Sequence, residues 1–254
     1  MTVLIGVRCV DGVVIGADSM ATSAMGLSPL VHLPSNSKIK IHTQNIISAS
    51  TGAVGFGQRL IHHIDAAIDG GVFRNFNKVD SVINVSKRFI KGLQESLAPV
   101  TAGQGIGFGA LLAAVIKDEP YLYEYDTVGF QPEIKEGNLF YVSIGSGQLL
   151  ADPFLAFVNR VLWKNTMPTV DQAKFGIYWA LDHTIRLAPI GVGGPIRLAT
   201  LSKVQGNWTA AEIEDTQEAS EYVTELEAHI MIFANRPLVA NASGPPPVPA
   251  PSPV

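Results

Sequence analysis

The sequence has a single cysteine, Cys9, among its 254 residues, so no disulfide can form within the chain. Cysteine usage of this kind is typical of a reducing compartment. Charge is also scarce, because Asp, Glu, Lys and Arg make up 16% of the residues and the net charge is −4. The lysines and arginines are scattered, whereas nucleic-acid binding needs a basic stripe or patch, so nucleic acid is not an expected partner.

Long hydrophobic runs are missing as well. No uninterrupted apolar stretch approaches the roughly 18 residues of a membrane helix. The first residues lack the basic segment and following apolar segment of a secretion signal. We therefore expect a cytoplasmic protein without a membrane partner. A metal or cofactor is not expected either, since the adjacent His62 and His63 would point about 100° apart on a helix.

Apolar residues are abundant, at 47% of the chain, which is enough for one sizeable core. The length fits a single domain, which we place at residues 1–235. Residues 236–254 include the segment SGPPPVPAPSPV. Its prolines cannot donate hydrogen bonds to a sheet and the segment cannot pack a core, so we expect a flexible tail.

Strands and helices alternate along the expected domain. Strands are indicated by β-branched and apolar runs bounded by turn residues, and helices by apolar positions three and four apart. The expected strands cover residues 3–9, 13–17, 38–41, 46–50, 110–116, 121–125, 139–143 and 196–201. The expected helices cover residues 54–68, 80–97, 149–163, 170–187 and an acidic segment at about 210–230. Pairs of helices between runs of strands favour two antiparallel sheets covered by helices over a doubly wound parallel sheet.

The first strand begins almost at the chain start. Its hairpin partner follows the two-residue turn Asp11-Gly12. Because ordering a terminus costs conformational entropy, an anchored terminus indicates that something depends on its position. If Met1 is removed, Thr2 becomes the first residue and carries both a side-chain hydroxyl and a free α-amine. The alternative is that Met1-Thr2 is an ordinary chain start.

Several segments together resemble the β-subunits of the proteasome and their bacterial self-compartmentalising relatives. The segments are TVLIGVRCVDGVVIGADSMAT, SKIKI, the turn Ser50-Thr51-Gly52 and YVSIGSG. The resemblance runs from Thr2 to about Leu201 and rests on the joint spacing of Thr2, Asp18, Lys38, Gly52 and Ser146. It implies the α+β fold of N-terminal-nucleophile hydrolases, a four-layer αββα sandwich with two antiparallel sheets between helix layers.

The resemblance implies a role for each of these residues. The Thr2 hydroxyl would be the nucleophile, and its α-amine, whose ordinary pKa of about 7.7–8.0 suits a base near neutral pH, would take the proton. Lys38 would lower the pKa of the hydroxyl and amine, and Asp18 would keep Lys38 charged and oriented. The backbone N–H of Gly52 would form the oxyanion hole, and Ser146 would hydrogen-bond the Thr2 amine and assist proton transfer. Residues in contact with the substrate would be Thr22, Ser50 and Val54.

Each assignment also has a structural alternative. A buried ammonium needs a carboxylate near it, so Lys38 and Asp18 are equally expected as a buried pair without a catalytic task. Gly52 is then a plain turn glycine. Ser146 is a good helix N-cap, a role that is compatible with the catalytic one.

The activity implied by the resemblance is that of a threonine endopeptidase. It would hydrolyse peptide bonds through an acyl-enzyme on Thr2, inside a self-compartmentalised, stacked ring of identical subunits. The expected partners are a peptide or unfolded protein substrate, further copies of the chain and an ATP-dependent unfoldase. Two alternatives are a noncatalytic scaffold subunit of such a ring and an N-terminal-nucleophile amidase acting on small amides.

The sequence departs from the family's pattern at three places. The loop at residues 23–37, between Asp18 and Lys38, is longer than usual. The family's Asp-x-x-Ser after the fourth helix is missing, and Asp182 is only a weak substitute, which removes an expected support of Ser146. The acidic segment and the proline-rich tail are additional to the core and indicate an outlying bacterial type.

Overall fold

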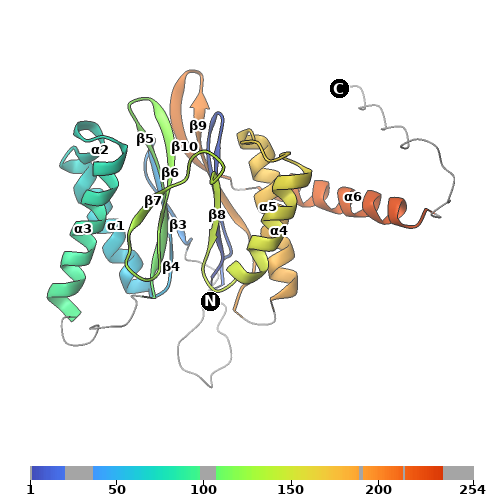
Figure 1. Ribbon diagram of the computed structural model, residues 1–254, viewed down its shortest axis with the longest axis horizontal. Coiled ribbons are helices and arrows are strands. Elements are labelled where there is room, and N and C mark those ends of the chain that lie inside the picture. Colours follow the sequence, from blue (N-terminus) through green and yellow to red (C-terminus); the bar gives the residue numbers. More distant parts are fainter. Residues whose placement is uncertain (1, 21–36, 98–106, 189–190, 214, 237–254) are drawn as a thin grey trace.

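The computed structural model describes residues 2–20, 37–97, 107–188, 191–213 and 215–236. Two five-stranded antiparallel sheets lie face to face, and helices cover their outer faces (Figure 1). The layers follow the order helix, sheet, sheet, helix. The expected α+β class and four-layer αββα sandwich are therefore confirmed. The expected proline-rich tail lies outside the described residues.

The first sheet contains the N-terminal hairpin. Its strands, in spatial order, are β10 (Asn207–Ile213), β9 (Arg197–Val204), β2 (Gly12–Ala17), β1 (Leu4–Cys9) and β8 (Tyr141–Ile144). β1 pairs with β2 from Leu4 opposite Ala17 to Cys9 opposite Gly12. On its other side β1 pairs with β8, with Leu4 opposite Ile144. The strand that follows Thr2 is thus held from both sides.

The second sheet carries the segments around Lys38 and Gly52. Its strands, in spatial order, are β3 (Ile39–Thr43), β4 (Ile46–Thr51), β5 (Gly109–Ile116), β6 (Glu119–Tyr125) and β7 (Pro132–Ile134). The edge strand β7 was not expected, because it has three residues and begins with Pro132. A proline lacks the N–H that a ladder needs and is accepted at a sheet edge.

An apolar layer fills the space between the two sheets. Leu4, Val13 and Ile15 from the first sheet belong to the same buried cluster as Ile47 and Leu111 from the second. Alternate residues along each strand face this layer, as the period of two for a β-strand requires. The two sheets are therefore packed into one body, which sets the N-terminal hairpin against the strands that carry Lys38 and Gly52.

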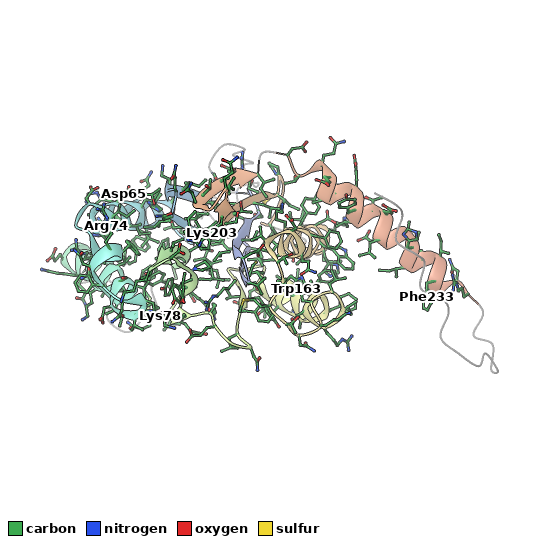
Figure 2. All side chains as sticks on the ribbon, turned by 90° about the horizontal axis from the view of Figure 1, so that it is seen from above. Asp65, Arg74, Lys78, Trp163, Lys203 and Phe233 are labelled. Atoms are coloured by element: carbon green, nitrogen blue, oxygen red, sulfur yellow. The ribbon has the colours of Figure 1, made fainter. Side chains whose placement is uncertain are left out.

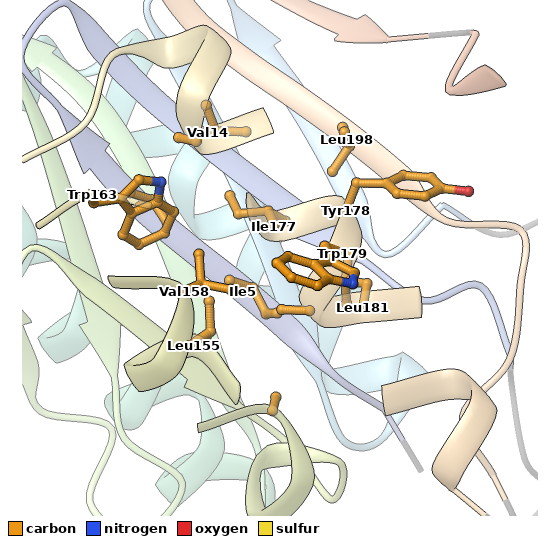
Figure 3. Packing of buried hydrophobic residues seen from close by; sticks show 14 of the residues in the cluster. Ile5, Val14, Leu155, Val158, Trp163, Ile177, Tyr178, Trp179, Leu181 and Leu198 are labelled. Atoms are coloured by element: carbon orange, nitrogen blue, oxygen red, sulfur yellow. The ribbon is translucent and has the colours of Figure 1, made fainter. Parts of the chain in front are cut away.

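Helices cover both outer faces of the sandwich (Figure 1). α1 (Val54–Asp69), α2 (Val72–Asn75) and α3 (Lys78–Leu97) lie on the second sheet, and α4 (Gln148–Val161) and α5 (Val170–Leu187) lie on the first. Figure 3 shows the latter packing, in which Ile5 and Val14 of the hairpin meet Leu155, Ile177 and Trp179. The four long helices agree with the expected ranges to within a few residues. None of the described helices is long and apolar enough to cross a membrane.

The acidic segment after β9 differs from the expectation. Residues 210–213, expected to be helical, belong to edge strand β10, and α6 covers Gln217–Ala234. Ala210 and Ala211 favour a helix locally, but the ladder from Asn207 opposite Val204 to Ile213 opposite Leu198 overrides that preference. α6 then extends away from the body of the molecule (Figures 1 and 2).

Candidate active site

Thr2 lies directly before β1 and is buried, with 7% of its surface exposed. Its backbone N–H donates a hydrogen bond to Ser146 Oγ at 3.0 Å, and its carbonyl oxygen accepts one from the N–H of Gly147 at 3.1 Å. Gly145 adopts φ 101°, and a Cβ at that position would lie 2.3 Å from the Thr2 carbonyl oxygen. Only glycine fits there. The turn between β8 and α4 therefore brackets the Thr2 backbone.

The Asp18 carboxylate connects Lys38 to the same segment. Its Oδ1 accepts hydrogen bonds from Lys38 Nζ at 2.5 Å and from the N–H of Val3 at 2.9 Å. Its Oδ2 accepts from the N–H groups of Met20 at 3.1 Å and Gly193 at 3.2 Å. Val3 N–H belongs to the peptide bond that joins it to Thr2. The Lys38 ammonium is therefore held beside that peptide bond.

Burial and ion pairing act on Lys38 in opposite directions. Burial lowers the pKa of its ammonium below the ordinary value, while the charge and hydrogen bond of Asp18 favour the protonated form. Its main chain is fixed as well, because its carbonyl oxygen accepts a hydrogen bond from the N–H of Ser50 at 3.2 Å. Lys38 is thus a positioned cation that gives up its proton more easily than an exposed lysine.

A cavity of about 380 Å³ opens beside Thr2. It is lined by Thr2, Thr51, Gly52, Gly107, Thr127, Gly145, Ser146 and Gln148. Three of the five predicted catalytic residues, Thr2, Gly52 and Ser146, therefore share one cavity. The other two, Lys38 and Asp18, are bonded to each other, and Asp18 is also bonded to the N–H of Val3 beside Thr2. A carbonyl group in this cavity would have Thr2 on one side and the backbone of Gly52 on another.

Gly52 adopts φ 109° at the end of β4. A Cβ at this position would lie 2.6 Å from the carbonyl oxygen of Gly107. The turn thus requires glycine both for its backbone conformation and for the close approach of another segment. Glycine is needed here whether Gly52 forms an oxyanion hole or only a turn, so this geometry is compatible with both interpretations.

The proteasome subunit family model matches residues 2–167, a range that contains all five predicted catalytic residues. The chain belongs to the proteasome subunit family. No curated protein matches the chain. Among solved structures, it resembles the Gly-1 mutant of Anbu from Hyphomicrobium sp. strain MC1, with 16% identity, a TM-score of 0.71, and coverage of 95% of this chain and 100% of that one.

A second similar structure is the helical assembly of the Anbu complex from Pseudomonas aeruginosa. Identity is again 16%, the TM-score is 0.69, and 95% of this chain and 99% of that one are covered. At this identity, the likeness to both Anbu structures establishes a shared fold. In the described part of the proteasome subunit, no group of three or more His, Cys, Asp or Glu residues could hold a metal ion.

The three substrate contacts, Thr22, Ser50 and Val54, stay predictions. Thr22 lies outside the described residues, as does most of the long loop. Ser50 faces α1, because a Cβ on Gly57 would lie 2.9 Å from its Oγ. Val54 is the first residue of α1 and is 62% exposed. Neither Ser50 nor Val54 lines the cavity beside Thr2.

Other cavity residues of the proteasome subunit were missed by the sequence reasoning. Thr51, Thr127 and Gln148 belong to the lining. Gln148 Nε2 donates to Asp152 Oδ2 at 3.0 Å, and Ser143 Oγ donates to Asp152 Oδ1, so Asp152 orients the Gln148 side chain. Thr51 stands in the quoted turn Ser50-Thr51-Gly52 but was assigned no role there, and Thr127 and Gln148 lie outside the quoted segments. The sequence around them gave no signal of a shared cavity.

The segment after α5 reaches the site in a different way from the expected motif. Asp182 Oδ2 lies 2.9 Å from Arg186 Nη2, although it has no well-directed hydrogen bond. The contacts from this segment to the site come from Gly193. Its N–H donates to Asp18 Oδ2, and its carbonyl oxygen accepts from the N–H of Ser19 at 2.9 Å. In this proteasome subunit, the segment after α5 therefore supports Asp18.

Proposed function

We propose that this proteasome subunit is a threonine endopeptidase whose nucleophile is the Thr2 hydroxyl, after cleavage of the Met1–Thr2 bond. One observation carries the proposal. A single oxygen of Asp18 binds both the Lys38 ammonium and the N–H of Val3, which fixes a cation beside the residue that would bear the nucleophile. A scaffold subunit has no need of this largely buried lysine, because an ion pair of this kind contributes little net stability relative to apolar residues of similar volume.

In the proposed reaction, the free amine of Thr2 takes the proton from its own hydroxyl as Oγ attacks the substrate carbonyl carbon. The carbonyl oxygen becomes an oxyanion that accepts a hydrogen bond from the N–H of Gly52. The amine then gives its proton to the leaving nitrogen, the peptide C–N bond breaks, and an ester to Thr2 is left. Water, deprotonated by the same amine, hydrolyses the ester and restores the hydroxyl.

Lys38 and Ser146 have supporting roles in this scheme. The positive charge of Lys38 favours the deprotonated hydroxyl of Thr2, and Asp18 keeps the lysine in place. Ser146 Oγ already accepts a hydrogen bond from the Thr2 nitrogen, so it is placed to orient the amine and to relay its proton. Gly145 supports both by allowing the turn to approach the Thr2 carbonyl.

We also propose that the subunit works in a stacked ring of identical copies in the cytoplasm, on peptides or unfolded proteins delivered by an ATP-dependent unfoldase. The exposed apolar side chains of α4 and α5, Leu149, Val161 and Leu187, support contacts between copies. The Pseudomonas aeruginosa relative is itself described as a helical assembly. A helix of subunits is therefore the alternative to a closed ring.

Labelling with an electrophile that reacts with an N-terminal threonine tests the proposal. Intact mass measurement should show a chain that begins at Thr2 and carries one label, and Thr2→Ala should carry none. A correctly processed, assembled chain that takes no label would support the noncatalytic scaffold. Turnover of small amides but not of peptides would instead support the amidase.

A further inference from the structure

The C-terminal end of α6 exposes four consecutive hydrophobic side chains. Ile230, Met231, Ile232 and Phe233 are 46%, 65%, 62% and 60% exposed. Phe233 lies on the part of the helix that is farthest from the body (Figure 2). An apolar cluster of this kind on an isolated helix end marks an interaction site. We call these four residues the tip of α6.

The tip continues the stripe by which α6 packs on its own subunit. Ala219, Val223 and Leu226 contact the core cluster beneath α4 and α5. Ile230 and Phe233 follow at the same spacing of four and three residues, beyond the contacts with the body. The direction of the helix is fixed by Glu227, which accepts hydrogen bonds from Trp179 Nε1 at 3.1 Å and from Arg186 at 3.3 Å. The tip is therefore held out in a defined direction.

The charge of α6 restricts the surface that could receive it. The helix carries Glu218, Glu221, Glu225 and Glu227, and it contains no lysine or arginine. A receiving surface should combine an apolar floor with a positive rim. Two α6 helices side by side would bring like charges together. The cavity of about 390 Å³ at the base of α6 is bordered by three carboxylates, those of Asp171, Asp215 and Glu218, and by Lys174, which pairs with Asp171. It is therefore net acidic, like α6.

A groove with the required character lies along α3. Its volume is about 330 Å³, its apolar walls include Ile83, Ile90 and Pro132, and Lys87 and Lys91 stand exposed on its rim. α3 as a whole carries four basic residues and two acidic ones. We call this site the α3 groove. Its apolar wall complements the tip, and its charge is opposite in sign to that of the glutamates on the preceding turns of α6.

Helix α3, which lines the groove, and the C-terminal end of α6 lie at opposite ends of the longest axis of the subunit (Figure 1). The tip of one subunit therefore cannot reach its own groove. We propose that the tip of α6 docks into the α3 groove of a second copy of this chain. Such a head-to-tail contact uses two different surfaces, so it repeats from copy to copy and produces a ring if the rotation closes and an open helix if it does not. The proposal does not depend on the threonine chemistry.

Cross-linking with a bismaleimide tests the contact directly. The native Cys9 is buried, so introduced cysteines dominate the reaction. A double variant, Met231→Cys with Gln94→Cys, should give a ladder of covalently linked chains, because every copy offers one cysteine at the tip and one at the groove. The matched control combines Gln94→Cys with Thr224→Cys and leaves Met231 unchanged. Thr224 is an exposed α6 residue outside the tip, so this variant should give no ladder.

The single variants distinguish the alternatives. Covalent dimers from Met231→Cys alone would show that two tips meet, and would overturn the proposal. The absence of a ladder from the double variant would overturn it as well. Charge reversal at the groove, Lys87→Glu with Lys91→Glu, should raise the subunit concentration needed for assembly by on the order of tenfold. Assembly unchanged by this reversal would contradict the assignment of the groove.

Discussion

At the scale of single residues, Lys38 separates a catalytic site from a structural ion pair. Lys38→Met keeps the apolar stem and removes the charge. If the charge stabilises the reacting Thr2 oxygen, we expect turnover of a peptide substrate to fall by on the order of 10²-fold or more. The measurement is turnover together with electrophile labelling of Thr2, at a temperature where the variant is still assembled. Full labelling of Thr2 in assembled Lys38→Met would show that the lysine only fills space.

The same substitution should leave the fold intact. Removing one partner of a buried ion pair typically costs about 3–5 kcal/mol, since the other charge is left without a partner. Asp18 keeps three backbone donors, the N–H groups of Val3, Met20 and Gly193. We therefore expect a smaller loss of stability, measured by thermal unfolding. Asp18→Asn is the matched comparison, because it removes the charge on the other side of the pair.

A second network of residues supports the strands that carry the site. His42 lies at a bulge in β3, where the register with β4 shifts. Its Nδ1 is 2.6 Å from Asp65 Oδ1 on α1, and its Nε2 is 2.8 Å from Ser48 Oγ on β4. The order resembles a serine hydrolase triad, but Ser48 is only 3% exposed and the His42 side chain is fully buried. We assign the network to fastening α1 onto the hairpin between Lys38 and Gly52.

This network predicts a pH dependence of stability. Burial lowers the pKa of His42 below its ordinary value near 6.5, although Asp65 acts in the opposite direction. Below pH 6.5 the unfolded chain binds a proton that the folded chain does not, so stability falls as the pH falls toward the folded pKa. His42→Gln should lose less stability than the natural chain between pH 7.5 and 5.5.

Thermal unfolding of both proteins at the two pH values measures the difference. His63 and His183 also have lowered pKa values, but both proteins contain them, so the comparison isolates His42. The control is His229→Gln, since His229 is exposed on α6. Equal pH dependence in His42→Gln and the natural chain would contradict the prediction.

The residues with a distinctive spacing could be predicted from the sequence, and those without one could not. Thr2 and Ser146 were expected together and share a hydrogen bond, as do Asp18 and Lys38. The cavity residues Thr51, Thr127 and Gln148 are ordinary polar residues. They become neighbours only when two sheets and a helix have packed, which no local pattern encodes.

At the scale of elements, the turn between β8 and α4 determines where Thr2 lies. Gly145→Ala would force a Cβ into the Thr2 carbonyl oxygen and an L side chain into φ 101°. We expect a lower midpoint of thermal unfolding and a large loss of Thr2 labelling, because the backbone of Thr2 has to move. The matched control is Gly137→Ala, at φ 62° with open space around it, which measures the conformational cost alone, about 1–2 kcal/mol. Equal effects of the two substitutions would contradict a bracketing role.

Helices with a long apolar periodicity were predicted well. Strands that form only because a neighbouring strand offers an edge were predicted poorly. The helices α1, α3, α4 and α5 have strong apolar periodicity and were expected. Residues 210–213 of β10 are expected to be helical from the sequence, since the alanines and glutamate suit a helix, but the edge of β9 pairs with them in a ladder. β7 was missed because its three residues depend on the edge of β6.

At the scale of the whole molecule, assembly is the main expectation. Exposed apolar residues lie on α4, α5 and α6 on one side of the sandwich, and Val54 of α1 and Val79 of α3 are exposed on the other. Sedimentation or mass photometry at micromolar concentration should show a multi-subunit particle, and Ile230→Asp with Phe233→Asp should reduce its size. A stable monomer of the natural chain at that concentration would contradict both the compartment and the docking of the α6 tip.

The position of Thr2 also has a consequence for the order of events during synthesis. Thr2 is synthesised well before its hydrogen-bond partner Ser146, which lies 144 residues further along the sequence. Asp18 similarly accepts a hydrogen bond from the N–H of Gly193, which lies 175 residues further along the sequence. Contacts of such separation form late, because long loops have to close first. If Thr2 is the nucleophile proposed above, its supporting contacts are complete only after most of the sandwich has been synthesised, and a half-synthesised subunit would not be an active peptidase.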